Sequence, residues 1–161
     1  MARVMIADDS DAIRLVLKKM VSLGEHEVVG EASDGAEAVE KFNAIKPDLL
    51  LLDLSMPEKD GLMVLKEIKE THPDAKIIVL SGDGNKEMIN KCLEAGAVSF
   101  IPKPFDFDQV IKALEEIWLT FDTNSKSKLK NPKNQLFLSN AFFQYYEIQT
   151  VTTIESRYLL P

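Results

Sequence analysis

Residues 49–53 read Leu-Leu-Leu-Leu-Asp, and this stretch decides the fold. The run is short and lies between Pro47 and Pro57, which favours a strand over a piece of helix. A strand of continuous apolar residues is buried on both faces, as in a parallel sheet covered by helices on both sides. Asp53 ends this strand, and burying an unpaired carboxylate there would be costly, so a functional role is the better interpretation of Asp53.

Outward from this stretch, short apolar runs alternate with amphipathic segments. Further strands are predicted at residues 4–7, 28–29, 77–80 and 98–101. Helices are predicted at residues 11–23, from 34 onward, at 61–70, 86–94 and from 106 to about 120. Asp34 with Glu37, and Asp106 with Gln109, have the spacing of capping boxes. Five β/α pairs predict an α/β fold, a doubly wound parallel sheet with helices on both faces.

Polar residues follow the predicted strands directly. They are Asp8, Asp9, Asp53, Ser81 and Lys103. The carboxyl ends of parallel strands meet at one edge of the sheet, where ligands bind, so these five side chains are expected to converge. Three neighbouring carboxylates repel unless a cation lies between them. Carboxylate oxygens suit Mg²⁺, and neither histidine follows a strand end where it would favour zinc.

This pocket has the groups that phosphoryl transfer needs. A metal that neutralises two carboxylates leaves the third free to attack phosphorus. The Lys103 ammonium can pair with the product phosphate, and the Ser81 hydroxyl can donate a hydrogen bond to it. Each residue also has a plainer interpretation. Asp8 and Asp9 could only start a helix, Ser81 could belong to an ordinary turn, and Lys103 could be a surface lysine.

Four stretches together are similar to one known family. They are Asp8-Asp9-Ser10, the Leu-Asp-Leu-Ser-Met-Pro of residues 52–57 with Asp60-Gly61, Leu80-Ser81-Gly82, and the Phe-Ile-Pro-Lys-Pro-Phe of residues 100–105. Over residues 2 to about 120 the sequence resembles a response-regulator receiver domain of the stand-alone chemotaxis type. The resemblance implies a flavodoxin-like, five-stranded (βα)5 fold with strand order 2-1-3-4-5.

The resemblance also implies the site. Asp53 would accept a phosphoryl group from the phosphohistidine of a histidine kinase. Asp9, Asp53 and the backbone carbonyl of Ser55 would bind Mg²⁺, with Asp8 acting through water. Lys103 would pair with the phosphate, and its bond to Pro104 would be cis.

The resemblance assigns a switch as well. Ser81 and Phe100 would move together, and the face of the fourth helix, fifth strand and fifth helix would change its partner binding. Ser55 and Asp83 would tune the lifetime of the phosphoryl group.

The 161 residues suggest one domain with an extension. We expect a receiver domain at 1–121 and a C-terminal extension at 122–161, with a linker at 122–135 and an aromatic-rich segment at 136–161. The extension is too short for a DNA-binding effector domain. Its aromatic segment either folds back on the receiver or pairs between protomers, or else is poorly ordered or foreign to the functional protein.

The composition of the chain indicates which kinds of binding partner and which location to expect. A net charge of −7 makes nucleic acid a poor partner, and no apolar run is long enough to span a membrane. The single Cys92 and the start without a signal peptide suggest the cytoplasm. We expect a monomer or weak dimer that binds a histidine kinase and a downstream protein, such as a motor switch, an adaptor or a phosphotransfer protein.

Three alternatives to a stand-alone switch remain. The chain could be a phosphorelay intermediate that passes its phosphoryl group to a histidine phosphotransfer protein. It could also be the receiver part of a regulator whose effector is absent or atypical. A HAD-like phosphatase would need Asp-x-Asp at the nucleophile, and Asp53-Leu54-Ser55 lacks the second acid. We therefore expect no enzyme activity beyond the protein's own phosphoryl transfer and autodephosphorylation.

Overall fold

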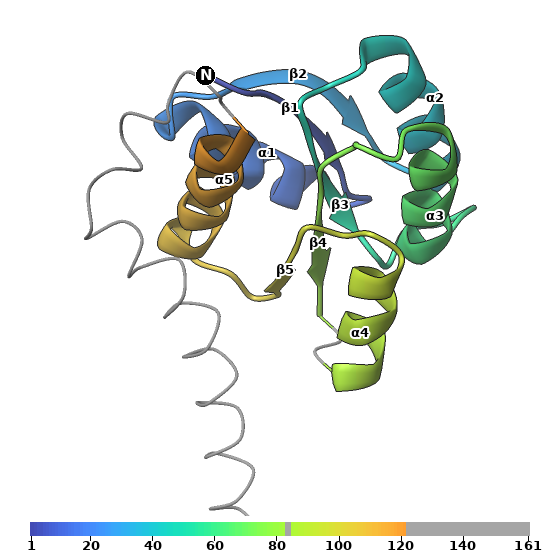
Figure 1. The fold of residues 1–161 in the computed structure, drawn as a ribbon. Helices are drawn as coiled ribbons and strands as arrows, with labels where there is room; N and C mark the ends of the chain where they lie inside the picture. The colour runs from blue at the N-terminus through green and yellow to red at the C-terminus, as the bar shows by residue number, and fades with distance from the viewer. Residues whose placement is uncertain (83–84, 122–161) are drawn as a thin grey trace, which may run out of the picture. The chain divides into compact units, whose positions relative to one another are not determined.

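The computed structural model describes residues 1–82 and 85–121. The strands are β1 (Arg3–Ala7), β2 (Glu27–Ala32), β3 (Leu49–Asp53), β4 (Ile77–Ser81) and β5 (Ser99–Pro102). The helices are α1 (Asp11–Leu23), α2 (Gly35–Ile45), α3 (Gly61–Thr71), α4 (Lys86–Glu94) and α5 (Phe107–Phe121). All strand pairs are parallel, in the order β2-β1-β3-β4-β5. The flavodoxin-like doubly wound fold predicted from the sequence is thus confirmed (Figure 1).

The chain divides into two units, Met1–Ile117 and Trp118–Pro161. The predicted linker at 122–135 and aromatic-rich segment at 136–161 lie outside the described residues. No helix in the described part of the chain combines the length and the apolar character that crossing a bilayer requires.

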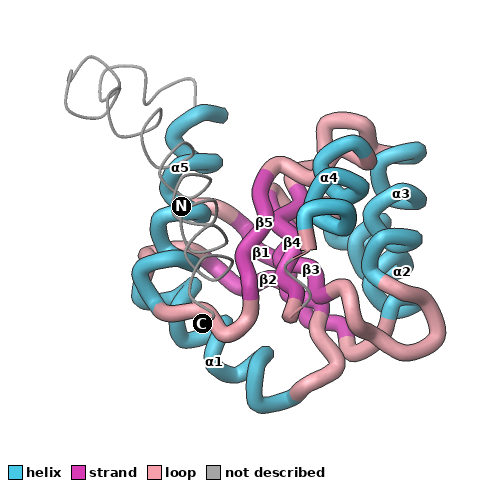
Figure 2. The backbone as a smooth tube through the Cα atoms, turned by 90° about the horizontal axis from the view of Figure 1, so that it is seen from below, coloured by secondary structure: helices cyan, strands magenta, loops and turns pink. Residues whose placement is uncertain are grey.

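The sheet has a core on each face, because successive side chains of a strand point to opposite sides. Figures 1 and 2 show α2, α3 and α4 on one face and α1 and α5 on the other. The first core joins strand residues to those three helices and includes Met5, Leu50, Leu52, Phe42 and Ile68. Every residue of β3 is buried, as the leucine run predicted.

The second strand is longer than predicted. The sequence indicated residues 28–29, whereas β2 spans Glu27–Ala32. In the described part of the chain β2 lies at the sheet edge and pairs with β1 alone, and most of its residues are half-buried. Its apolar signal is weak because an edge strand does not need apolar residues throughout.

Each helix begins where a side chain accepts a backbone N–H. At four helices the N-cap accepts the N–H of the residue three positions on, and these caps are Ser10, Asp34, Asp60 and Asn85. Asp106 and Gln109 form a reciprocal capping box, as predicted. At α2 the box is modified, because Glu37 accepts the N–H of Ser33 instead of that of the N-cap, Asp34.

Glu37→Gln is expected to destabilise the protein by roughly 0.5 kcal/mol at pH 7, a small effect because solvent screens the site. The hydrogen bond from Lys41, followed by that from the Ser33 N–H, lowers the pKa of Glu37 to about 2. A lowered folded-state pKa stabilises the fold above the ordinary value of 4.5, and this stabilisation is lost as the pH falls toward about 2.

Urea unfolding between pH 7 and pH 3 checks this prediction. The gap between the Glu37→Gln variant and the parent should close as the pH falls. Glu40→Gln, on the exposed face of the same helix, serves as the control and should show no such trend. A gap that stays constant with pH would contradict the role of the carboxylate charge.

The backbone between β3 and α3 makes close contacts with two glycines, Gly61 at the start of α3 and Gly35 at the start of α2. A Cβ on Gly61 would lie under 3.0 Å from the carbonyl oxygen of Asp53, and one on Gly35 equally close to that of Lys59. The Gly61 N–H donates to the Leu54 carbonyl at 2.9 Å. The start of α3 is therefore in direct backbone contact with the end of β3.

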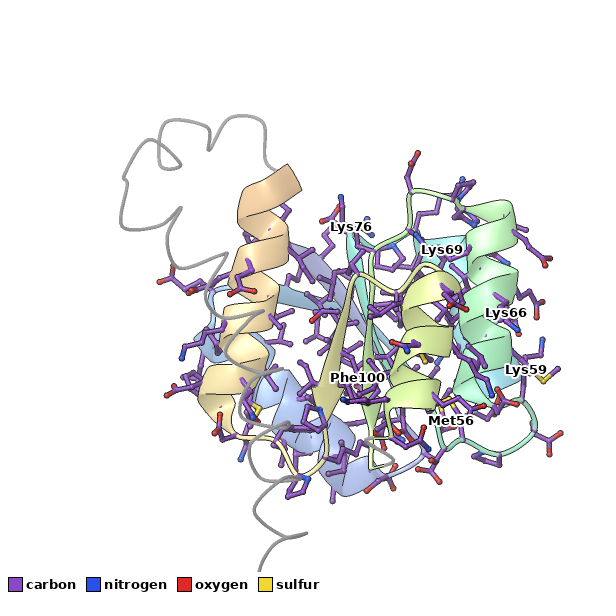
Figure 3. All side chains as sticks on the ribbon, turned by 60° about the horizontal axis from the view of Figure 1, so that its bottom comes forward. Met56, Lys59, Lys66, Lys69, Lys76 and Phe100 are labelled. Carbon is purple, nitrogen blue, oxygen red and sulfur yellow. The ribbon has the colours of Figure 1, made fainter. Side chains whose placement is uncertain are left out.

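The opposite end of the molecule has a second close contact. Lys69, near the end of α3, donates through Nζ to the carbonyl oxygens of Pro73 and Ala75 at 2.8 and 2.7 Å. Its side chain lies against Gly96, which follows α4 and has a φ of +98°. Figure 3 shows Lys69 toward the end of α3 that is remote from Met56. Lys69 of α3 thus packs against the turn that follows α4.

Candidate functional site

The predicted site residues lie at the carboxyl ends of the strands. Figure 2 looks onto this edge of the sheet. Asp8 follows β1, Asp53 and Ser81 end β3 and β4, and Lys103 follows β5. Strand register places these residues at similar levels along the strand direction, because Asp53 pairs with Leu80 and Ser81 pairs with Pro102. Parallel pairing therefore brings side chains up to 95 positions apart in the sequence to one edge.

Lys103 joins two of the carboxylates. Its Nζ lies 2.7 Å from Oδ2 of Asp8 and 2.9 Å from Oδ1 of Asp53. Both acids are buried, with Asp8 fully inaccessible and Asp53 2% exposed. The backbone N–H of Lys103 donates to the Ser81 carbonyl at 2.7 Å, and the Lys103-Pro104 bond is cis, as expected. The backbone bond to Ser81 and the two ion pairs thus place the ammonium between the carboxylates.

Burial and pairing compete in the pKa values. Burial raises the pKa of Asp53, and the hydrogen bond and charge of Lys103 only partly offset it. The charge of Asp8 raises it further, whereas the Ser55 N–H lowers it. For Lys103, burial favours the neutral form, but its hydrogen bonds to Asp8 and Asp53 prevail and raise its pKa. Lys103 therefore stays protonated, and Asp53 carries a carboxylate that its surroundings stabilise incompletely.

The backbone beside Asp8 is also fixed. The Asp8 N–H donates to the Ala32 carbonyl at 3.1 Å, and the Ser10 N–H donates to Oδ1 of Asp8 at 2.9 Å. Nη1 of Arg14 donates to the Asp8 carbonyl at 2.7 Å. The sequence interpretation missed Arg14. A basic residue one turn into the helix that follows the acid pair was the available signal.

The acidic residues fit a divalent ion. Oxygen atoms of Asp8, Asp9 and Asp53 all lie within 4.8 Å of one another. Three carboxylates against the single ammonium of Lys103 leave a formal excess of two negative charges, which one divalent ion balances. Asp9 is exposed, which leaves room for the water ligands that Mg²⁺ retains.

The other predicted site residues lie as follows. Ser81 is buried, Ser55 is exposed, and Asp83 lies outside the described residues. Phe100 is half-buried against the same core as Met56 and lies between β5 and α4 in Figure 3. The ring is thus placed where α4 and β5 meet.

A sequence model of the response regulator receiver domain matches residues 4–115. With the fold and the acidic pocket described above, this match shows that the chain belongs to the response regulator receiver family. Such domains are signalling components of two-component systems rather than conventional enzymes.

Two curated relatives and one solved structure are of the chemotaxis type. The chemotaxis protein CheY of Thermotoga maritima is 44% identical over 115 residues, which cover 71% of this chain and 96% of that protein. CheY of Bacillus subtilis is 42% identical over 71% of this chain and 95% of its own. A CheY from Borrelia burgdorferi, solved with CheX, BeF3 and Mg²⁺, superposes with a TM-score of 0.71 at 31% identity, covering 72% of this chain and 88% of that one. The chain is therefore a CheY-like receiver.

Proposed function

We propose that this protein accepts a phosphoryl group on Asp53 from the phosphohistidine of a histidine kinase and thereby changes its affinity for a downstream protein. The contact of one ammonium, that of Lys103, with both buried acids carries this proposal. It places a positive charge beside the carboxylate that would react. Asp9, Asp53 and the Ser55 carbonyl would hold Mg²⁺, with Asp8 bound through water, and the ion would supply the positive charge that balances the phosphoryl oxygens.

The proposed transfer uses few protein groups. A carboxylate oxygen of Asp53 forms a bond to phosphorus as the bond from phosphorus to the imidazole nitrogen breaks, and the imidazole keeps that electron pair. Lys103 is within reach to exchange a carboxylate partner for a phosphoryl oxygen. Water would later remove the group, with Ser55 and Asp83 tuning that rate.

The output would pass through Ser81 and Phe100. Ser81 ends β4, and Phe100 lies on β5 with its ring near α4. As the family resemblance implies, the Ser81 hydroxyl would turn toward a phosphoryl oxygen and the Phe100 ring would move inward with it. The face of α4, β5 and α5 would then bind a motor switch, an adaptor or a phosphotransfer protein. We assign this function to residues 1–121 and treat 122–161 as the extension.

Acetyl phosphate tests the proposal. With Mg²⁺, the full chain should gain one phosphoryl group, which peptide mass spectrometry after borohydride reduction should place on Asp53. Chelation of the ion should stop the labelling. Labelling on another carboxylate, or labelling that survives chelation, would refute the assignment.

Partner binding is tested separately. A pull-down with and without beryllofluoride should capture a protein that depends on the activated form. Transfer of the label to a histidine phosphotransfer domain would instead favour the relay. No activated-state binding in either assay would argue against a switch.

A further inference from the structure

Arg14 makes contacts in three directions from α1. Its Nη1 donates to the Asp8 carbonyl at 2.7 Å, its Nη2 pairs with Asp11, and its Nε lies 3.5 Å from Oε2 of Glu31. Only 14% of the Arg14 side chain is exposed. A guanidinium so largely covered is stable when acids pair with it, and Asp11 and Glu31 do so here.

The contact at Asp8 bears on the site through the backbone. The carbonyl of Asp8 belongs to the rigid peptide group that leads into Asp9. The other side of Asp8 is held as well, because its N–H donates to the Ala32 carbonyl at 3.1 Å. With both sides fixed, the direction in which the Asp8 side chain leaves the backbone is fixed too, and the peptide group bonded to Arg14 sets where Asp9 begins. These are two of the three carboxylates whose oxygens lie within 4.8 Å of one another.

The geometry suits arginine specifically. A guanidinium presents donors in a planar fork, so one side chain serves the Asp8 carbonyl, Asp11 and Glu31 together. A lysine at this position has a single ammonium at the end of a flexible chain. It keeps the charge but cannot reproduce the three directions.

We propose that Arg14 is a positioning residue that sets the spacing of the Asp8 and Asp9 carboxylates and thereby the affinity of the pocket for Mg²⁺. This inference rests on the proposed function, because Asp8 and Asp9 belong to the same acidic pocket as the proposed phosphoryl acceptor, Asp53. The alternative is that Arg14 only ties α1 to β2 through Glu31 and adds stability.

Lys18 provides the matched control. It also lies on α1 and pairs with Glu31, at 2.8 Å, but none of its described contacts reaches Asp8. Removing Lys18 therefore disturbs the link between α1 and β2 while it leaves the Asp8 carbonyl bonded to Arg14.

The test measures Mg²⁺ binding to the full chain by titration calorimetry. Arg14→Lys and Arg14→Gln should each weaken Mg²⁺ affinity about tenfold, as outer contacts of metal sites do, whereas Lys18→Gln should leave it unchanged within about twofold. The sign is diagnostic, because removing a positive charge by Arg14→Gln would by electrostatics alone strengthen cation binding. Unchanged or tighter binding in Arg14→Gln, or equal weakening in Lys18→Gln, would overturn the proposal.

A second measurement, urea unfolding with and without Mg²⁺, reports the Mg²⁺ affinity even in a variant that is less stable than the parent. Mg²⁺ bound to the folded state raises the free energy of unfolding by an amount set by its affinity. The Mg²⁺-dependent shift of the urea midpoint should be smaller in both Arg14 variants than in the parent and in Lys18→Gln. An equal shift in all four proteins would contradict the positioning role.

Phosphorylation by acetyl phosphate separates this inference from the proposed function. In the Arg14 variants the Mg²⁺ concentration for half-maximal labelling should rise about tenfold, with the rate at saturating Mg²⁺ nearly unchanged. If the Arg14 variants bind Mg²⁺ more weakly than the parent, as predicted, but the parent is never labelled, the proposed function fails and the inference stands. If the parent is labelled and Arg14→Gln binds Mg²⁺ normally, only the inference fails.

Discussion

Asp53→Asn should abolish labelling by acetyl phosphate and, without Mg²⁺, make the protein more stable at pH 7. The amide has nearly the shape of the carboxylate but is a poor nucleophile, so labelling should fall at least about 100-fold. The side-chain oxygen of Asn can still accept the hydrogen bond that Lys103 now donates to Oδ1 of Asp53 at 2.9 Å. The packing at the end of β3 should therefore be kept.

The gain in stability follows from the sign of the pKa shift. Burial raises the pKa of Asp53 in the folded protein above its ordinary value of 3.8. The ionised side chain therefore costs stability that is absent below pH 3.8 and fully present once the pH exceeds the folded-state pKa. The amide has no such cost.

Urea unfolding without Mg²⁺ at pH 7 and pH 4 checks this expectation, and the advantage of the variant should shrink at the lower pH. Asp60→Asn is the matched control, because Asp60 is an exposed acid in the same loop and Asn caps a helix equally well. The control should be labelled like the parent. Loss of labelling in both variants would show that the loop, and not the Asp53 carboxylate, was responsible.

Gly61→Ala should lower the free energy of unfolding by about 2–4 kcal/mol, because the backbone cannot yield to a methyl group at low cost. The new carbon would meet the carbonyl of Asp53 and the Cα of Leu54, neither of which is the flexible end of a side chain. To relieve the overlap, α3 must move away from β3, and the hydrogen bond from Gly61 to Leu54 must lengthen.

Chemical denaturation and the rate of labelling both report this change. The rate should fall together with stability, because the displaced atoms belong to the acceptor residue. Gly82→Ala is the control on the other side of the site, where an added Cβ meets no atom of the described residues within 4 Å, and it should change stability by less than about 1 kcal/mol. Equal losses in the two variants would mean that the sequence requires glycine at 61 for some reason other than the close contact.

The fold could be predicted because its signals are local. The four leucines before Asp53 mark a strand buried on both faces, and the structure buries each of them. The pairing of Asp106 with Gln109 was equally readable, since it lies within one helical turn. The convergence of Asp8, Asp53 and Lys103 followed from a topological rule about parallel sheets and not from any spacing in the sequence.

What the sequence did not reveal depends on contacts between distant segments. Lys103 was predicted to pair with a phosphate, and nothing in the sequence showed that it bonds to Asp8 and Asp53 together. Arg14 was missed because its partners lie on α1, on β2 and at the end of β1, and only the folded chain brings them together. The full length of β2 escaped notice because an edge strand carries a diluted apolar pattern.

The contact of Lys69 with Gly96 has a mechanical consequence for α4. The Lys69 side chain packs against Gly96, just after the end of this nine-residue helix, while the helix begins five residues after Ser81. Such a helix is about 13 Å long, so a tilt of about 10° about the end packed against Lys69 would carry the other end through about 2 Å. A small rotation at the end remote from the acidic pocket would thus become a movement as large as an atom's radius at the end nearer to it.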